Sequence, residues 1–276
     1  MKPLLKWAGG KRHIAGELIS LFPEDWDKQT YFEPFIGGAA LFFELSPKQA
    51  VISDVNKRLI GFYQHVREDL DALLAQIQTI SKNFDECHDD LKKEYFLNLR
   101  AEFNSSDVES LESASKLFAL NKLCFNGLYR ENSKGGFNVP FGQKNKFPSI
   151  EFDDFKNASF ALQRAEVNVS DFEATVAGAQ SGDFVYFDPP YIPIDLTSSF
   201  TSYNANGFTL EDQKRLANLL HDLKSRSIKA LCSNSETEKT REIYDGLNIR
   251  VIQAPRMVSA KSSGRGLIDE LVISNF

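Results

Sequence analysis

The sequence contains few of the residues that build metal sites or disulfide frameworks. Its 276 residues include only three cysteines and four histidines, and both are widely spaced. They form no zinc-ribbon, zinc-deaminase or CxxC redox pattern. Cys124 has no histidine near it in the sequence, which argues against a thiol nucleophile. We therefore expect neither a metal site nor a disulfide framework.

Long apolar runs are also missing. No uncharged apolar stretch approaches the ~18 residues that a membrane-spanning helix requires. The first ten residues lack the apolar region of a signal peptide. Hydrophobic residues make up 42% of the chain and charged residues 25%, which is typical of a globular protein. These features predict a cytoplasmic protein without membrane contact. The length of 276 residues fits one large domain or a core domain that carries an insert.

The net charge of −6 argues against a nucleic-acid partner, but the basic residues are gathered in particular segments. Segments 1–13 and 250–268 contain basic residues and no acids, and segment 122–146 contains five basic residues and one acid. Segment 82–112 has nine acids and four basic residues. This segregation fits one basic binding face, and it also fits unrelated solvated patches.

Alternating strand and helix patterns predict an α/β fold with a parallel sheet. A helical segment from 56 to about 123 and a loop or hairpin at 126–148 interrupt this pattern as an insert of roughly a hundred residues. Thr209 is the predicted N-cap of the last helix. The other expected elements are strand–turn–helix–strand at 31–55, strands at 165–169 and 183–187, a helix at 210–225, and strands at 229–232, 249–253 and 270–274.

A glycine pair, Gly37-Gly38, lies at the first strand-to-helix turn, and Asp54 ends the next strand. A carboxylate about twenty residues beyond such a turn binds the hydroxyls of a ribose. The turn lacks the complete G-x-G-x-x-G pattern, and Glu33 would repel a phosphate but suits an amino group. The ligand predicted by these residues is a nucleoside joined to an amino acid, such as S-adenosylmethionine. The alternative is a purely structural turn.

The segment Asp188-Pro-Pro-Tyr191 ends an apolar strand and is the most informative part of the sequence. The two prolines cannot continue a strand ladder, so they fix the Asp188 carboxylate at the carboxyl end of the sheet. Asp188 and the Pro189 carbonyl supply two acceptors for the two N–H bonds of an exocyclic amine. Tyr191 supplies a stacking face for an extrahelical base. The alternative interpretation is a surface turn.

Together these blocks resemble the Dam-type DNA adenine-N6 methyltransferases of the alpha group, which recognise GATC. The resemblance covers nearly the whole chain. Ala39 stands where that family often has glycine, which costs little if the backbone there is not at positive φ, and Phe125 stands where tyrosine is frequent. The matching blocks are Lys6-Trp-Ala-Gly-Gly-Lys11, Glu33-Pro-Phe-Ile-Gly-Gly, Asp54, Phe125-Asn-Gly-Leu-Tyr-Arg130, Phe137-Asn-Val-Pro-Phe-Gly142, Asp188-Pro-Pro-Tyr191, Phe200-Thr-Ser-Tyr203 and Ser233-Asn234.

The resemblance implies a Rossmann-like S-adenosylmethionine-dependent methyltransferase sheet with a helical target-recognition insert. Residues 1–55 and 158–276 then form the catalytic domain, and 56–157 form the DNA-binding insert. The implied reaction transfers a methyl group to adenine N6 in double-stranded DNA, at GATC, after base flipping. The resemblance further implies a monomer, and it leaves restriction–modification, mismatch repair and a phage function open as biological roles.

The resemblance also assigns site residues. Lys11 is expected to pair with the methionine carboxylate of the cofactor. Asp171 either accepts a hydrogen bond from the adenine amino group of the cofactor or caps a helix. The catalytic residues are Asp188, Pro189, Pro190 and Tyr191. The cofactor-binding residues are Trp7, Ala8, Gly9, Lys11, Glu33, Phe35, Gly37, Asp54, Asp171, Phe172 and Asp188.

The segment 121–146 interleaves basic and aromatic residues, which suits phosphate contacts and insertion into a base stack. Arg130 suits a bidentate contact to guanine, and Leu128 suits contact with a thymine methyl group. Phe125 and Asn126 are expected to replace the expelled adenine. The lysines have plain solubility as an alternative role, and 261–265 has a hairpin turn as its alternative. The DNA-binding residues are Phe125, Asn126, Leu128, Arg130, Lys134, Asn138, Pro140, Lys144, Lys261 and Arg265.

Two other functions stay open at this point. The same catalytic apparatus also fits methylation of cytosine N4 or of RNA adenine. A catalytically silent DNA-binding regulator is the alternative from a different functional class, although the intact Asp188–Tyr191 segment and Asp54 speak against it.

Overall fold

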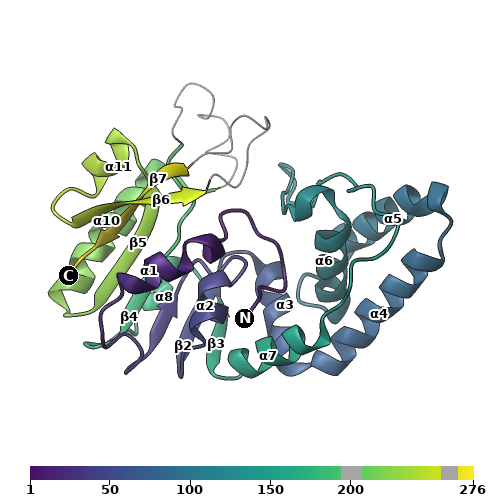
Figure 1. Cartoon of the computed structure of the whole chain (residues 1–276), viewed down its shortest axis with the longest axis horizontal. Coiled ribbons are helices and arrows are strands. Elements are labelled where there is room, and N and C mark those ends of the chain that lie inside the picture. The colour runs from purple at the N-terminus through teal and green to yellow at the C-terminus, as the bar shows by residue number, and fades with distance from the viewer. Residues whose placement is uncertain (194–206, 256–266) are drawn as a thin grey trace. The chain divides into compact units, whose positions relative to one another are not determined.

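The computed structural model describes residues 1–193, 207–255 and 267–276 (Figure 1). The predicted contact residues Lys261 and Arg265 lie outside these residues, as does the segment 200–203. Contacts divide the chain into two compact units. The first contains Met1–Gly10, Gly37–Ser46 and Asp54–Val169, and the second contains Lys11–Ile36, Pro47–Ser53 and Ser170–Phe276. The predicted domain boundaries at 55/56 and 157/158 remain a prediction.

The second unit is built on strands in the order β2-β1-β4-β5-β7-β6. The strands β2, β1, β4 and β5 are parallel, as predicted, whereas β7 runs antiparallel to both β5 and β6. The expectation of a parallel sheet is therefore wrong for β7, which lies between β5 and β6 and runs antiparallel to both. The strands are β1 (Tyr31–Glu33), β2 (Ala50–Asp54), β4 (Phe184–Phe187), β5 (Lys229–Ser235), β6 (Asn248–Pro255) and β7 (Leu267–Ser274).

Helix α10 (Leu210–Ser225) packs on β5 and covers the core of this unit (Figure 1). Its buried side chains recur at intervals of three and four residues, which is the period of one helix face. Thr209 and Asp212 form a capping box, so the predicted N-cap is confirmed. The unit also contains η1 (Lys11–His13), α1 (Ala15–Ser20), α8 (Phe172–Val176) and α11 (Glu238–Ile243).

The first unit is mainly helical, as predicted for the insert. Helix α6 is almost entirely buried and packs against α3, α4 and α5. The predicted apolar stripe of α4 is confirmed, because Leu73, Leu74 and Ile77 are buried. Its elements are α2 (Ala40–Leu45), α3 (Lys57–Glu68), α4 (Leu70–Glu86), η2 (Asp89–Leu91), α5 (Lys92–Ser105), α6 (Leu111–Leu123), η3 (Phe125–Gly127), α7 (Phe152–Leu162) and β3 (Ala165–Val169).

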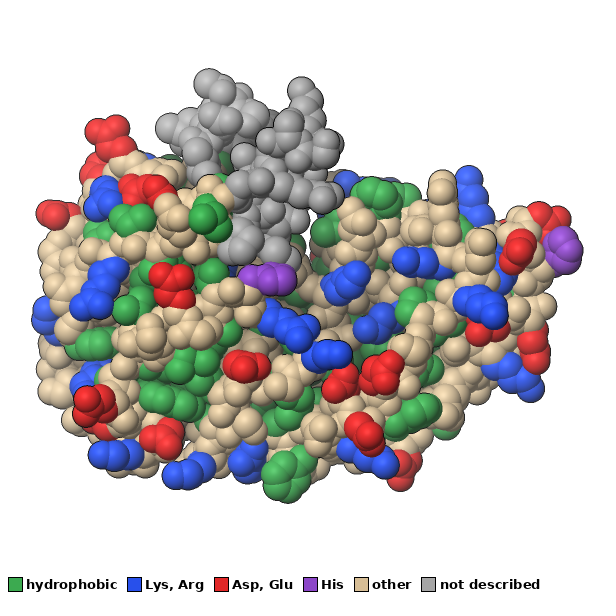
Figure 2. Space-filling model, in the orientation of Figure 1, with side chains coloured by type: hydrophobic (Ala, Val, Ile, Leu, Met, Phe, Trp, Pro, Cys, Tyr) green, Lys and Arg blue, Asp and Glu red, His purple; other side chains and the backbone are tan. Residues whose placement is uncertain are grey.

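Among the described residues, no helix is both long and apolar enough to cross a bilayer. Acidic and basic side chains both occur over the face shown in Figure 2, so the negative net charge does not produce a uniformly acidic surface.

Candidate active site

In the first unit, the glycine turn is built around Trp7. A Cβ on Gly37 would lie 3.0 Å from the Trp7 ring, and one on Gly38 would lie 2.9 Å from the Trp7 Cβ. We predicted that a ligand approaches the backbone closely at these two glycines. In the structure, the Trp7 side chain makes this close approach. Gly37 has φ +45°, which favours glycine.

Asp54 is fixed beside this turn by two backbone donors. The Gly37 N–H donates to Asp54 Oδ2 at 3.2 Å, and the Asn56 N–H donates to Asp54 Oδ1 at 2.9 Å. Burial raises the pKa of Asp54, and these backbone hydrogen bonds oppose that shift. Each carboxylate oxygen keeps a lone pair for a further donor, which is the chemistry that ribose hydroxyls require.

Ala39 is the N-cap of α2 and adopts a left-handed conformation with φ 57°. The sequence expectation was that alanine costs little here if φ is not positive. The structure does not meet that condition, so Ala39 carries backbone strain that a glycine would avoid.

The amino-terminal segment is tied to the predicted DNA-reading loop within the first unit. Buried Asn121 accepts a hydrogen bond from the Lys6 N–H at 2.9 Å and donates to the carbonyls of Lys6 and Gly127 at 2.8 and 3.0 Å. The rings of Trp7 and Tyr129 are stacked at 4.8 Å. Ala8 and Gly9 follow as exposed residues. A predicted cofactor residue and the reading loop thus share one packed cluster.

The reading loop itself is irregular and closed by two isolated bridges, Cys124 with Phe141 and Glu131 with Phe137. The Phe125 ring at its start is 52% exposed, and Asn126 adopts φ 57°. The Pro140 carbonyl accepts from the Phe125 N–H at 2.9 Å. This structure confirms the expected loop or hairpin and presents an aromatic ring to solvent.

Arg130 is exposed and held by Asn138. Its Nε donates to Asn138 Oδ1 at 2.7 Å, and its Nη2 donates to the Asn138 carbonyl at 3.4 Å. These bonds use the Nε side of the guanidinium group, and no ion pair involves Arg130 among the described residues. The Nη1–Nη2 edge is therefore available for a planar acceptor pair. Lys134 and Lys144 are exposed, and Leu128 is half-buried.

Cys124, at the base of this loop, is buried, and burial raises the pKa of its thiol to about 11. The thiol is therefore protonated at neutral pH, which agrees with the argument against a nucleophilic cysteine.

In the second unit, Phe35 and Phe172 stack with their ring centres 5.5 Å apart, next to Phe208. Asp171 caps α8, because its Oδ1 accepts from the Glu173 N–H at 3.0 Å. The Arg215 guanidinium also donates to this Oδ1 at 3.2 Å. The helix-cap interpretation of Asp171 is thus correct, and its role toward a cofactor remains a prediction.

Glu33 is buried at the end of β1, where it accepts a hydrogen bond from the Tyr31 hydroxyl at 2.8 Å. Glu33 therefore already accepts a hydrogen bond from another residue of β1, and its role toward an amino group remains a prediction.

The predicted catalytic segment begins directly after β4. Lys11 Nζ lies 2.8 Å from Asp188 Oδ1, and the Lys11 side chain is only 6% exposed. The same ammonium lies over the Tyr191 ring, 4.5 Å from its centre. Burial raises the pKa of Asp188, and the charge of Lys11 opposes that shift. The pairing of Lys11 with Asp188 was not predicted, since Lys11 was expected to face the cofactor carboxylate.

Buried side chains that the sequence analysis missed hold the backbone after Asp188. Gln213 on α10 donates to the Pro190 carbonyl at 2.8 Å, and its Oε1 accepts from Asn234 and Tyr244 at 2.9 and 2.7 Å. Asn234 also accepts from the Ile192 N–H at 3.2 Å. Ser233-Asn234 carried part of the resemblance, but only the structure explains why an amide is needed there.

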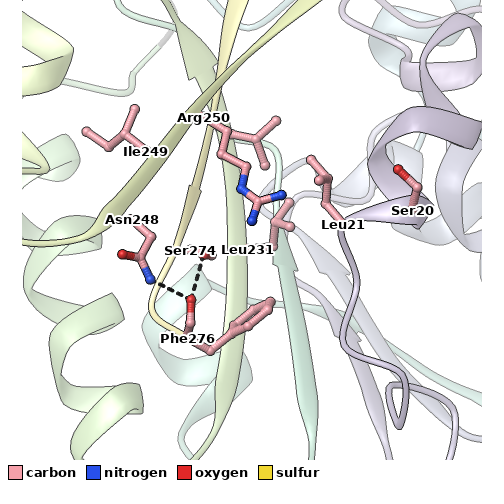
Figure 3. Close-up of a pocket in the computed structure, with 9 residues that line it drawn as sticks. Ser20, Leu21, Leu231, Asn248, Ile249, Arg250, Ser274 and Phe276 are labelled. Carbon is pink, nitrogen blue, oxygen red and sulfur yellow. Dashed lines mark hydrogen bonds between the residues drawn. The ribbon is translucent and has the colours of Figure 1, made fainter.

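A pocket of about 540 Å³ in the second unit lies apart from these groups in sequence (Figure 3). Asn248 and Ser274 donate to the Phe276 carbonyl oxygen there, and the Arg250 side chain extends into the pocket. None of its lining residues is a predicted site residue. The lining residues are Ser20, Leu21, Leu231, Asn248, Ile249, Arg250, Val272, Ser274 and Phe276.

Comparison with known proteins agrees with this arrangement. Residues 7–258 match the D12 class N6 adenine-specific DNA methyltransferases. The chain belongs to this family. A type II methyltransferase of Lactococcus lactis subsp. cremoris is 39% identical over 281 residues, covering 100% of this chain and 96% of that protein. The DNA adenine methylases of Vibrio cholerae and Escherichia coli are 37% and 32% identical, covering 98% of this chain and 95% and 94% of those proteins.

These findings confirm the predicted Dam-type resemblance, the methyltransferase fold class and the enzymatic function. The methyltransferase acts on adenine N6 in DNA. Among the described residues, no group of three His, Cys, Asp or Glu side chains is arranged to hold a metal ion.

Proposed function

We propose that this DNA adenine methyltransferase uses S-adenosylmethionine, acts on a flipped adenine within GATC in double-stranded DNA, and works as a cytoplasmic monomer without a metal ion. The observation that carries this proposal is the group formed by Lys11, Asp188 and Tyr191. It supplies a carboxylate acceptor, a cation that favours the ionised carboxylate, and an aromatic ring at one strand end.

The residues present suit the proposed cofactor. Asp54 offers carboxylate lone pairs to ribose hydroxyls, and the Phe35–Phe172 stack offers an apolar aromatic surface for an adenine ring. When bound, S-adenosylmethionine supplies an electrophilic methyl group on a sulfonium centre. We assign Trp7, Ala8, Gly9 and Gly37 to the same cofactor, and Lys11 to its carboxylate once Asp188 is engaged by the target base.

Asp188 is assigned to the target amine. Its carboxylate accepts one amine N–H and the Pro189 carbonyl accepts the other, which directs the nitrogen lone pair toward the incoming methyl group. Orientation and electrostatic stabilisation are the main contributions to such a transfer. Asp188 does not need to be a strong base, because the proton leaves after methylation, when the amine is acidic.

The reading loop is assigned to sequence recognition. The exposed Nη1–Nη2 edge of Arg130 fits the O6 and N7 atoms of one guanine. We assign exposed Phe125, with Asn126 beside it, to insertion into the base stack, and exposed Lys134 and Lys144 to phosphates. Leu128 and Pro140 supply apolar contacts for a thymine methyl group.

Methyl transfer from labelled S-adenosylmethionine tests the proposal. One duplex contains unmethylated GATC, and three matched duplexes each differ from it by a single base pair. We expect label only in the GATC duplex, recovered as N6-methyladenine after digestion. Equal labelling of all four duplexes would remove the assignment of GATC. Label recovered as N4-methylcytosine, or found only in RNA, would contradict the assigned substrate.

A further inference from the structure

Glu270 on β7 faces the catalytic tyrosine, although no sequence motif pointed to it. The Tyr191 hydroxyl donates to Glu270 Oε2 at 2.9 Å. The backbone of Glu270 is fixed on both sides, because it pairs with Ser235 of β5 and with Ile252 of β6. Strand β7, which pairs with a strand on each side, thus positions the carboxylate next to the Tyr191 hydroxyl.

Asp188 belongs to the same group as Tyr191, because the Lys11 ammonium that lies over the Tyr191 ring is 2.8 Å from Asp188 Oδ1. The Tyr191 hydroxyl and the charge of Glu270 act in opposite directions on the pKa of Asp188, since the first lowers it and the second raises it. A tyrosine hydroxyl carries only one proton, so it serves Glu270 or Asp188 at any moment. Burial raises the pKa of Tyr191 well above its usual range, so the proton stays on the phenol at neutral pH.

This competition matters because Asp188 already accepts one donor. Lys11 occupies its Oδ1 at 2.8 Å. If Tyr191 donated to the same carboxylate, fewer lone pairs would remain for the two-acceptor arrangement that activates the target amine.

We propose that Glu270 is a positioning residue that holds the Tyr191 hydroxyl away from Asp188. It thereby keeps the Asp188 carboxylate open to the target amine and fixes the Tyr191 ring for stacking on the adenine. This inference rests on the proposed function, since it assigns a role to a group around the same site.

A double-mutant test separates this role from simple structural support. The single-turnover rate of methyl transfer to a GATC duplex is measured for Glu270→Leu, Tyr191→Phe and the double variant. Glu270→Leu should lower the rate about tenfold, as expected for one misdirected hydrogen bond at the reacting group. Tyr191→Phe in the Glu270→Leu background should restore the rate to within about twofold of Tyr191→Phe alone, because no hydroxyl remains to occupy Asp188.

Additive losses in the double variant would overturn the proposal, because they would mean that Glu270 acts independently of the Tyr191 hydroxyl. Asp269→Asn is the matched control. Asp269 is the exposed neighbour on the same strand, is paired with Gln253 at 3.5 Å, and should leave the rate unchanged. Thermal unfolding and cofactor affinity check that each variant is folded.

Glu270→Gln provides a test that does not depend on the leucine variant folding. Its amide oxygen still accepts from Tyr191, so the rate at pH 8 should stay within about twofold of wild type. Loss of the negative charge removes an influence that raises the pKa of Asp188, so the acid limb of the pH–rate profile should move to lower pH. An unchanged or upward-shifted acid limb would contradict the proposal.

The other groups around Asp188 do not supply this charge effect. Lys11 of η1 is a cation and lowers the pKa of Asp188 in wild type and variant alike. The remaining neighbours are phenols and a thiol whose pKa values are raised, so they stay neutral across the acid limb. They are Tyr31 of β1, Tyr186 of β4, Tyr191 and Cys232 of β5. Buried Glu33 of β1 faces Tyr31 and is the same in both proteins.

The outcomes also separate this inference from the proposed function. A wild-type protein that methylates no GATC duplex would overturn the proposed function itself. An active wild type with additive losses, or with an unshifted acid limb in Glu270→Gln, would overturn only the role of Glu270.

Discussion

The proposed catalytic segment 188–192 and the proposed reading loop 124–142 both follow a regular element, but the hydrogen-bonding partners of their polar groups differ. In the catalytic segment, the Pro190 carbonyl and the Ile192 N–H are bound by the buried side chains of Gln213 and Asn234. In the reading loop, main-chain bridges close the turn, and Arg130 and Phe125 extend toward solvent.

This contrast fits the role that we propose for each segment. Methyl transfer depends on fixed geometry, and buried amides that satisfy every neighbour fix a backbone strongly. Sequence recognition needs side chains that are exposed to solvent in the free protein and contact base edges in a DNA groove when bound. The exposed donors of the reading loop fit this requirement. The proposed catalytic segment is therefore held firmly by buried side chains, whereas the proposed reading loop is accessible to DNA.

The largest expected change comes from breaking the buried network. Gln213→Leu leaves the Pro190 carbonyl, Asn234 and Tyr244 without a shared partner. We expect a loss of about 3 kcal/mol or more in the free energy of unfolding, because each buried group without a hydrogen bond costs ~1–3 kcal/mol. Urea unfolding followed by circular dichroism measures this loss.

Tyr244→Phe is the matched control for that variant. It removes the buried hydrogen bond that the Tyr244 hydroxyl donates to Gln213, but it leaves the bond that Gln213 donates to the Pro190 carbonyl intact. We expect about 1 kcal/mol of destabilisation and a methyl-transfer rate close to that of the wild type. Equal rate losses in the two variants would show that the Pro190 contact has no special importance.

An intermediate effect is expected in the reading loop. Arg130→Ala should cost ~1–3 kcal/mol in discrimination at one guanine while leaving protein stability nearly unchanged, because the side chain is exposed. Competition between GATC and singly substituted duplexes measures this discrimination. If Arg130→Ala keeps the full sequence preference, the guanine contact is assigned to the wrong residue.

The smallest expected effect concerns the glycine turn. Ala39→Gly should stabilise the protein by about 1 kcal/mol, because glycine adopts the left-handed conformation without the Cβ clash. Ala40→Gly, one position later in the ordinary helical region of α2, should instead destabilise by ~0.5–1 kcal/mol. Thermal unfolding of both variants compares them, and the same sign for both would refute the strain at Ala39.

Features set by neighbouring residues were predictable from the sequence. The bounds of α10 and its Thr209 cap follow from a capping box and an apolar period within a few residues. Asp188-Pro-Pro-Tyr191 was identified for the same reason, since its chemistry lies in consecutive residues. The ordered blocks then pointed to the family that the comparisons show.

Features set by contacts between distant segments were not predictable. The antiparallel direction of β7 depends on pairing with β5 and β6, and local periodicity does not encode strand direction. The Lys11–Asp188 ion pair and the Tyr191–Glu270 hydrogen bond join residues far apart in the sequence. Gln213 was missed because a glutamine within a helix pattern gives no sign that it is buried.

The measurement that tests the central claim most directly compares Asp188→Ala with the wild type in two assays. The first assay is methyl transfer to a GATC duplex, and the second is the binding of S-adenosylmethionine. We predict that the variant loses transfer, by a factor of ~10³ or more since the acceptor for the target amine is gone, while it still binds the cofactor. Transfer at a rate close to wild type would contradict the assignment of Asp188 as the residue that engages the target adenine.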